Sequence, residues 1–136
     1  MFFDCYDMAD YRRLEVWQKA HAFAVDVVRA SEVIVGKTAS IVRDQLVRAV
    51  LSIPSNIAEG SAKKSDREFA RFTRIALGSS TEAENHLLVA GALDLMDART
   101  CARFEGEIED IRKMLTGLEK RLSADADARP ARRNRS

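Results

Sequence analysis

The sequence predicts an all-α fold: an antiparallel, up-down-up-down four-helix bundle whose second helix is kinked at Pro54. The chain has 136 residues but only six glycines and two prolines, which favours helices over β-structure with many turns. Four segments repeat apolar residues at steps of three and four, as amphipathic helices do. The length, with 46% hydrophobic and 32% charged residues, is typical of one soluble, core-forming domain.

The first predicted helix spans about residues 10–32 and carries two adjacent apolar stripes. Leu14, Trp17 and His21 lie on one stripe, and Val16 begins the other. A helix with two such stripes is buried on more than one side or contacts another subunit. We expect Trp17 to anchor this packing, because an indole buries a large area. We expect His21 to be a core or interface residue.

The second predicted helix begins at Thr38 or Ser40, either of which can cap it, and ends at Gly60. Its apolar residues keep their phase straight across Pro54. That continuity would have no explanation if the helix stopped at the proline. We therefore expect one continuous helix with a kink at Pro54.

Pro54 also creates a gap in the hydrogen bonds of this helix. A proline inside a helix costs roughly 3 kcal/mol, and here it leaves the carbonyl of Val50 without its usual donor. Ser55 and Asn56 follow directly, and side chains of these types bond to nearby backbone groups. We expect both to help compensate for the missing donor.

The third predicted helix runs from Ser65 to about Ala90. Ser65 and Glu68 have the spacing of a capping box, in which the serine bonds forward and the glutamate reaches back. A glycine in mid-helix costs roughly 0.5–1 kcal/mol against alanine, so we expect a neighbouring helix to approach closely there. The small residues at the helix centre are Ala76, Gly78, Ser79, Ser80 and Ala83.

The fourth predicted helix starts after Asp97, and its apolar residues alternate steps of three and four, the spacing of a coiled-coil seam. After Ser123 the composition of Ala, Asp, Arg and Pro is typical of disorder. The predicted organisation is a flexible N-terminus (1–9), a four-helix bundle (10–123) and a disordered, Arg-rich tail (124–136). The seam comprises Cys101, Phe104, Ile108, Ile111, Leu115, Leu118 and Leu122.

Composition argues against several classes of protein. The net charge of +1 is much lower than the strongly positive charge that is typical of dedicated nucleic-acid binders. Cys5 and Cys101 lie too far apart for metal-ligand spacing, so we expect two reduced thiols. No run approaches the roughly 18 apolar residues of a membrane span. The acidic start, which lacks a basic segment, does not resemble a signal peptide, and Met8 is a second plausible start. We expect a cytoplasmic protein that does not bind membranes.

No catalytic, cofactor or metal site is predicted. Di-iron bundles use Glu-x-x-His pairs, but neither Glu82 nor Glu84 has a histidine three residues later. His21 and His86 are the only histidines. A Ser/His/Asp arrangement in a known local context and a glycine-rich phosphate loop are both lacking. We therefore expect a protein that is not an enzyme and needs no cofactor.

Polar residues inside the apolar segment 52–60 indicate a candidate site, because unpaired polar groups near a core are costly. We expect Glu59 to meet Arg71 or Arg74 in a structural polar cluster between the second and third helices. A contact with a ligand or partner is the alternative. The predicted cluster comprises Pro54, Ser55, Asn56, Glu59 and Arg71.

Basic residues gather at the second loop and continue along the third helix at steps of four and three. A row of cations can follow the phosphates of a nucleic acid. Asp66 and Glu68 are interleaved with the row, so a solvated face of mixed charge is the alternative. The possible nucleic-acid contacts are Lys63, Lys64, Arg67, Arg71 and Arg74.

Four segments together carry a family resemblance: residues 14–20, 52–60, 68–72 and 75–84. The first reads Leu-Glu-Val-Trp-Gln-Lys-Ala, and the second reads Ser-Ile-Pro-Ser-Asn-Ile-Ala-Glu-Gly. Over about residues 14–122 the chain resembles the four-helix-bundle proteins encoded in intervening sequences of large-subunit (23S) ribosomal RNA genes. It departs from that pattern between Glu32 and Asp44, where a proline or aromatic residue usually enters the second helix.

The resemblance implies an antiparallel four-helix bundle that assembles into a ring, usually a pentamer, and it brings no catalytic residue. It also implies kinship with the accessory proteins of diversity-generating retroelements, which bind nucleic acid and a reverse transcriptase. We therefore expect a non-catalytic, homopentameric helical scaffold associated with RNA or a nucleoprotein. The alternative is a nucleic-acid-binding accessory protein of a reverse transcriptase-type enzyme. The double stripe of the first helix and the small residues of the third favour self-association.

Overall fold

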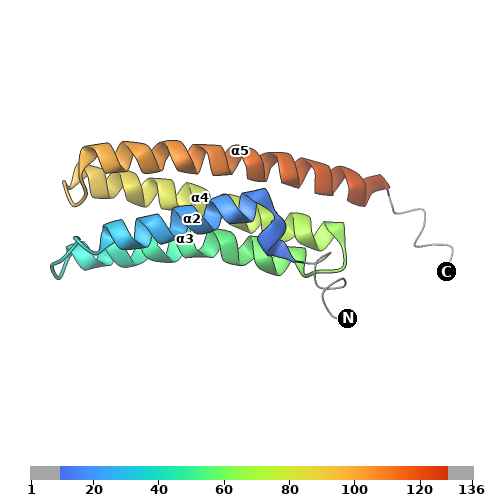
Figure 1. Cartoon of the computed structure of the whole chain (residues 1–136), viewed down its shortest axis with the longest axis horizontal. Coiled ribbons are helices and arrows are strands. Elements are labelled where there is room, and N and C mark those ends of the chain that lie inside the picture. Colours follow the sequence, from blue (N-terminus) through green and yellow to red (C-terminus); the bar gives the residue numbers. More distant parts are fainter. Residues whose placement is uncertain (1–9, 129–136) are drawn as a thin grey trace.

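The computed structural model describes residues 10–128 and contains four α-helices and one short 3₁₀ turn, with no strand in that range. The α2–α3 and α4–α5 connections lie at one end of the molecule, and the α3–α4 turn lies at the other (Figure 1). The predicted all-α class and the four helices are confirmed. The elements are η1 (Tyr11–Arg13), α2 (Glu15–Ser31), α3 (Ala39–Ser61), α4 (Asp66–Ala92) and α5 (Ala98–Ala128).

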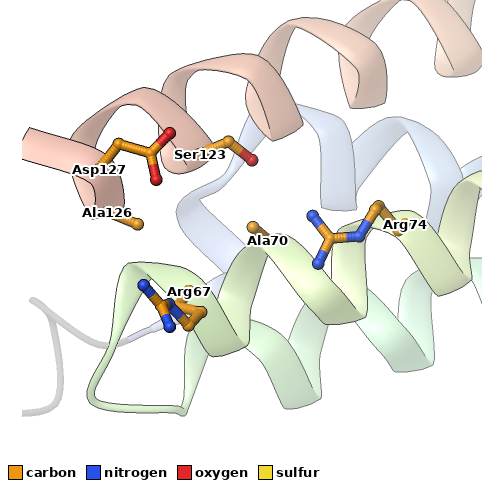
Figure 2. A pocket seen from close by; sticks show the side chains of 6 residues that line it. All are labelled: Arg67, Ala70, Arg74, Ser123, Ala126 and Asp127. Atoms are coloured by element: carbon orange, nitrogen blue, oxygen red, sulfur yellow. The ribbon is translucent and has the colours of Figure 1, made fainter.

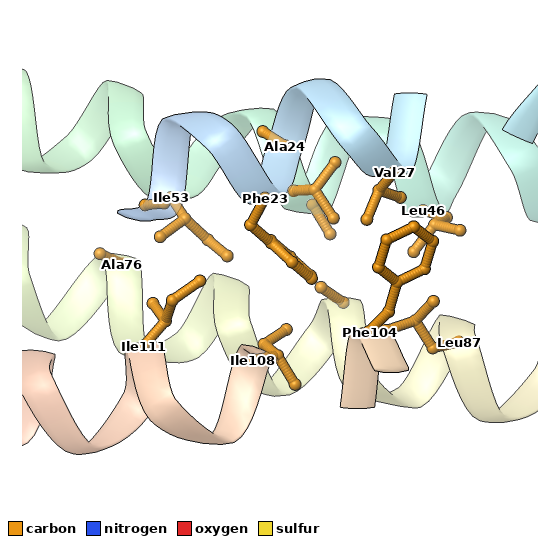
Figure 3. Packing of buried hydrophobic residues seen from close by; sticks show 14 of the residues in the cluster. Phe23, Ala24, Val27, Leu46, Ile53, Ala76, Leu87, Phe104, Ile108 and Ile111 are labelled. Atoms are coloured by element: carbon orange, nitrogen blue, oxygen red, sulfur yellow. The ribbon is translucent and has the colours of Figure 1, made fainter. Parts of the chain in front are cut away.

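One core receives side chains from all four helices. Phe23 of α2 and Phe104 of α5 meet edge to face near its centre, with ring centroids 5.9 Å apart (Figure 3). Aromatic pairs favour this geometry because the positive ring edge meets the negative ring face. The coiled-coil spacing of α5 correctly predicts its buried face: six of the seven seam residues are buried, and Leu118 is partly buried against the core.

The first helix is shorter than predicted, because α2 begins at Glu15. Asp10 instead caps the η1 turn, where its side chain accepts a hydrogen bond from the Arg12 backbone N–H at 3.0 Å. The core position that we considered for His21 is wrong, while a position at an interface stays a prediction. His21 is exposed and stacks on the partly buried Trp17, with ring centroids 4.7 Å apart.

The helix α3 continues through Pro54, which is buried, and Ile57 beyond it is fully buried. The apolar phase across the proline therefore predicts the continuous helix correctly, while a bend at Pro54 stays a prediction. The helix ends at Ser61 and not at Gly60, which lies buried inside its last turn.

Ser55 and Asn56, which follow the proline, donate hydrogen bonds to other carbonyls than the predicted one. The Ser55 hydroxyl donates to the Leu51 carbonyl at 3.0 Å, and the Asn56 amide donates to the Ser52 carbonyl at 2.8 Å. Neither bonds to the Val50 carbonyl. A side chain reaches most easily to the carbonyl one turn before its own residue, which explains the difference.

Both expected caps form at the starts of α4 and α5. The Ser65 hydroxyl accepts from the Glu68 backbone N–H at 3.1 Å, and the Asp97 carboxylate accepts from the Thr100 backbone N–H at 3.3 Å. The reciprocal half of the predicted capping box is not formed, because the Glu68 carboxylate pairs with Arg71 instead.

The predicted boundary at residue 123 is wrong, since α5 continues to Ala128. Every second residue from Ala124 to Ala128 is alanine, the strongest helix former, and this favours extension of the helix. The Ser123 hydroxyl also donates to Glu119 one turn back, at 2.7 Å. The predicted flexible segment 1–9 and the rest of the predicted tail, 129–136, lie outside the described residues.

Candidate nucleic-acid interface

The five predicted nucleic-acid contacts are all exposed, and they follow the α3–α4 turn and the first two turns of α4. Two of them are placed by Phe72. The Lys63 ammonium lies 5.4 Å and the Arg71 guanidinium 4.6 Å from the centroid of its ring. Cation–π attraction holds such cations against the ring face. We call Lys63, Lys64, Arg67, Arg71 and Arg74 the basic row.

Acidic partners neutralise part of the basic row. Arg71 pairs with Glu68 at 3.1 Å on the same helix, and Arg74 pairs with Glu119 of α5 at 3.0 Å. These hydrogen-bonded cations hold the pKa of both carboxyl groups below their usual range, with the Ser123 hydroxyl contributing most at Glu119. The other three cations of the row have no ion pair within residues 10–128.

A shallow cleft of about 330 Å³ lies between α4 and α5 beside the basic row. Arg67 and Arg74 project from α4 on one wall, and Asp127 projects from α5 opposite them (Figure 2). The cleft is therefore polar and of mixed charge. It lacks the enclosed apolar lining by which proteins bury small organic ligands.

The predicted polar cluster does not form as a unit. Glu59 is exposed and has no ion pair in the described part of the chain, because Arg71 and Arg74 are engaged by Glu68 and Glu119. Of the predicted cluster, only Asn56 takes part in polar contacts that lead across the interface between α3 and α4.

The contacts that do cross that interface involve two serines, and sequence reasoning missed this arrangement. The Asn56 amide donates to the Ser52 hydroxyl at 2.9 Å, and the Ser52 and Ser79 hydroxyls lie 2.7 Å apart. Because Ser52 accepts from Asn56, its own proton is free to go to Ser79. This chain of hydrogen bonds satisfies three polar groups beside the apolar core.

A second ion pair between α4 and α5 was also missed. The Arg112 guanidinium donates to Glu84 at 3.3 Å, while its Nε and second terminal nitrogen are buried without a hydrogen-bond partner. In the Arg74–Glu119 pair the cation lies on α4, whereas in the Arg112–Glu84 pair it lies on α5. No spacing within either helix could have indicated them, because they depend on the register between helices.

Three further observations limit what the described residues can do. Within residues 10–128, no three His, Cys, Asp or Glu side chains lie close enough to hold a metal ion. Cys101 is a buried free thiol, and burial raises its pKa, so the reactive thiolate is disfavoured. In the same range, no helix is both long and apolar enough to cross a bilayer.

The described residues thus define a class: an all-helical protein with four helices and a basic row at one end. A family model described as 23S rRNA-intervening sequence protein matches residues 12–117, so the chain belongs to this family. Curated proteins give no match. The fold is similar to a crystal structure of a protein with unknown function from the S23 ribosomal protein family of Bacteroides thetaiotaomicron, with a TM-score of 0.72. That match is 24% identical and covers 77% of this chain and 98% of the other, so it supports the fold alone.

Proposed function

We propose that this protein is a non-catalytic, oligomeric helical scaffold that binds structured RNA through the basic row. The observation that carries the proposal is the group of Lys63, Lys64 and Arg67, three exposed cations without an ion pair within residues 10–128. Surface cations without an ion pair can release counterions from phosphates without first breaking a salt bridge within the protein. The membership of a family defined by rRNA intervening sequences points to RNA as the polyanion.

The rest of the proposal concerns the scaffold. We infer an antiparallel bundle bent at Pro54, working in the cytoplasm as an assembly of several copies, five in the ring that the resemblance implies. The single apolar core shared by all four helices supports a role in which the protein presents its surface to a partner. If the protein is related to the accessory proteins of diversity-generating retroelements, the basic row would hold nucleic acid near a reverse transcriptase.

The proposal is tested by fluorescence anisotropy with a labelled, structured rRNA fragment at several salt concentrations. Three phosphate contacts predict a loss of about 20- to 40-fold in affinity between 50 and 200 mM salt. The triple variant Lys63→Ala/Lys64→Ala/Arg67→Ala should weaken binding and flatten this salt dependence.

A matched control removes the same charge elsewhere. Arg99, Lys120 and Arg121 of α5 are exposed and have no ion pair among the described residues. Their triple alanine variant should bind RNA with nearly wild-type affinity and salt slope. Equal losses of RNA affinity in both triple variants would show that the effect comes from net charge alone. If the wild type does not bind RNA at low salt, the proposal is wrong.

A further inference from the structure

Three aromatic rings lie in series at the start of α2, outside the basic row. Tyr11 and Trp17 meet edge to face, with ring centroids 5.1 Å apart and planes at 63°. His21 stacks on Trp17 from one helical turn further along, with centroids 4.7 Å apart and planes at 16°. We call Tyr11, Trp17 and His21 the aromatic ladder. Its last ring, His21, is exposed, whereas the other two are partly buried.

The inner part of the aromatic ladder is anchored to the rest of the protein. Trp17 packs against the core. The Gln18 amide donates to the Arg12 carbonyl at 2.8 Å, and the Leu14 backbone N–H donates to the Tyr11 carbonyl at 2.9 Å, so η1 is tied to α2. The rings are therefore in place before any ligand arrives. A surface that is ordered in advance loses less conformational entropy on binding.

The His21 ring has one face open. Trp17 covers the other face, and within residues 10–128 the imidazole makes no hydrogen bond, no ion pair and no other ring contact. A second flat group could stack on the open face without displacing a partner. The neighbours of His21 one turn away on α2 are all uncharged. They are Trp17, Gln18, Ala24 and Val25.

The aromatic ladder lies toward the end of the bundle that carries the basic row. Figure 1 shows η1 and the start of α2 toward the end with the α3–α4 turn, and η1 contacts α3. The acids of α2 nearest to this side, Glu15 and Asp26, lie about 120° and 140° around the helix from His21. A polyanion held by the basic row therefore meets no acid of α2 on the side of the ladder.

A flat, open ring beside a basic surface suits an unpaired nucleobase. Proteins bind single-stranded parts of RNA by stacking their bases on aromatic side chains, histidine included. Every base has a π-face, so this contact tolerates different sequences. A base inside a stem cannot make it, because both of its faces are covered by neighbouring base pairs. The row and the ladder thus suit different parts of one RNA.

We propose that the open face of His21 stacks with an unpaired base of an RNA whose phosphates contact the basic row. The inference rests on the proposed function and adds the class of ligand, namely RNA in which unpaired nucleotides lie next to a stem. His21 makes the contact with the base. Trp17 and Tyr11 are positioning residues, since they hold the imidazole.

Fluorescence anisotropy of the full chain with two labelled RNAs tests the proposal. One RNA is a stem–loop, and the other is the same stem–loop with abasic nucleotides in the loop, which keeps every phosphate and removes only the loop bases. A stacked base contributes roughly 5- to 100-fold in affinity, so the wild type should prefer the intact loop by such a factor. His21→Ala should lose this preference, and His21→Phe should retain it because it keeps a flat ring.

His86 provides the matched control. It is the other histidine of the chain and lies partly buried on α4, so His86→Ala should keep the wild-type preference for the intact loop. The two histidines also give a second readout, the NMR signals of their ring protons. A base stacked on His21 should shift its ring protons upfield and leave those of His86 in place. The abasic RNA should shift neither.

The results separate this proposal from the one for the basic row. Equal affinity of the wild type for the two RNAs, or a preference for the intact loop that survives in His21→Ala, overturns the base site and leaves the row standing. If Lys63→Ala/Lys64→Ala/Arg67→Ala binds the abasic RNA as tightly as the wild type does, the row is not the phosphate site. No binding of either RNA overturns both proposals.

A second copy of the chain is the other possible occupant of the open face. His21 signals that move with protein concentration in the absence of RNA would show that another copy covers the ring. That result would overturn the base site. Signals that stay in place on dilution and move only when the stem–loop is added agree with the proposal.

Discussion

Gly60 lies so close to Phe72 that a Cβ at position 60 would come within 2.8 Å of the Phe72 Cβ. The ring of Phe69 approaches the same point to 2.8 Å. The last turn of α3 can therefore pack on the first turns of α4 only because residue 60 has no side chain. This contact fixes the geometry of the turn that carries Lys63 and Lys64.

The first prediction concerns this contact. Gly60→Ala should lower the free energy of unfolding by about 1–3 kcal/mol, because the added methyl meets the Cβ of Phe72, which cannot move without the backbone. Urea denaturation measures the change. Gly117→Ala is the control: its Cβ meets nothing within 4 Å, so the helix should gain up to about 1 kcal/mol. Equal effects at the two glycines would contradict the packing argument.

The second prediction compares Asn56→Leu with Glu59→Leu. Asn56 donates to Ser52 at two atoms, so its replacement leaves polar groups unpaired beside the core and should cost about 1–3 kcal/mol. Glu59 is exposed and makes no ion pair within residues 10–128, so its replacement should change folding by less than about 0.5 kcal/mol.

Thermal unfolding distinguishes these two variants. A loss of stability at Glu59 as large as that at Asn56 would mean that the carboxylate has a structural partner.

The sequence predicted the faces of the helices better than the contacts between them. The phase of Ile57 relative to residues before Pro54 was enough to predict a continuous helix, and the α5 seam predicted its buried side. Both depend on periodicity within one helix, which the sequence contains directly.

The partners of charged residues could not be predicted in the same way. Arg74 pairs with Glu119 of α5 and not with Glu59, and the pairing depends on how far α5 is shifted along α4. The same shift aligns Arg112 with Glu84. His21 illustrates a further limit. A stripe of apolar residues shows which side of a helix is buried, but not how far around the helix the buried surface extends. His21 lies just outside that surface.

The third prediction concerns acid stability. The Ser123 hydroxyl and Arg74 lower the pKa of Glu119 from its usual value of 4.5. A carboxyl with a lowered folded-state pKa contributes stability above its unfolded pKa, and this is lost as pH falls through the folded value. Glu119→Gln should therefore lower stability at pH 7 but bring it closer to wild type at the lowest pH that allows measurement.

Denaturation at a series of pH values below 7 provides the test. Glu109→Gln is a suitable control, because Glu109 forms an exposed pair with Lys113 within one helix. Such pairs contribute little to stability. Its difference from wild type should be small at every pH, and a pH-independent deficit for Glu119→Gln would contradict the linkage.

The last prediction concerns Cys101, which lies in the core with only 5% of its surface exposed, and whose thiol donates weakly to the Met96 carbonyl at 3.9 Å. Burial raises the pKa of this thiol, and Glu105 and Asp97 act in the same direction. In a Cys5→Ser background, reaction of Cys101 with a thiol reagent at pH 8 should be slower than in denaturant by a factor on the order of 100 or more, because attack requires local opening.

The raised pKa of Cys101 also makes stability depend on pH. Its contribution is fully present below the pKa of the unfolded state and is lost as pH rises through the pKa of the folded state. Stability should therefore fall above about pH 9. Cys101→Ala should remove that part of the alkaline loss at the cost of a small cavity, and rapid labelling of folded Cys101 would show instead that this end of α5 opens freely.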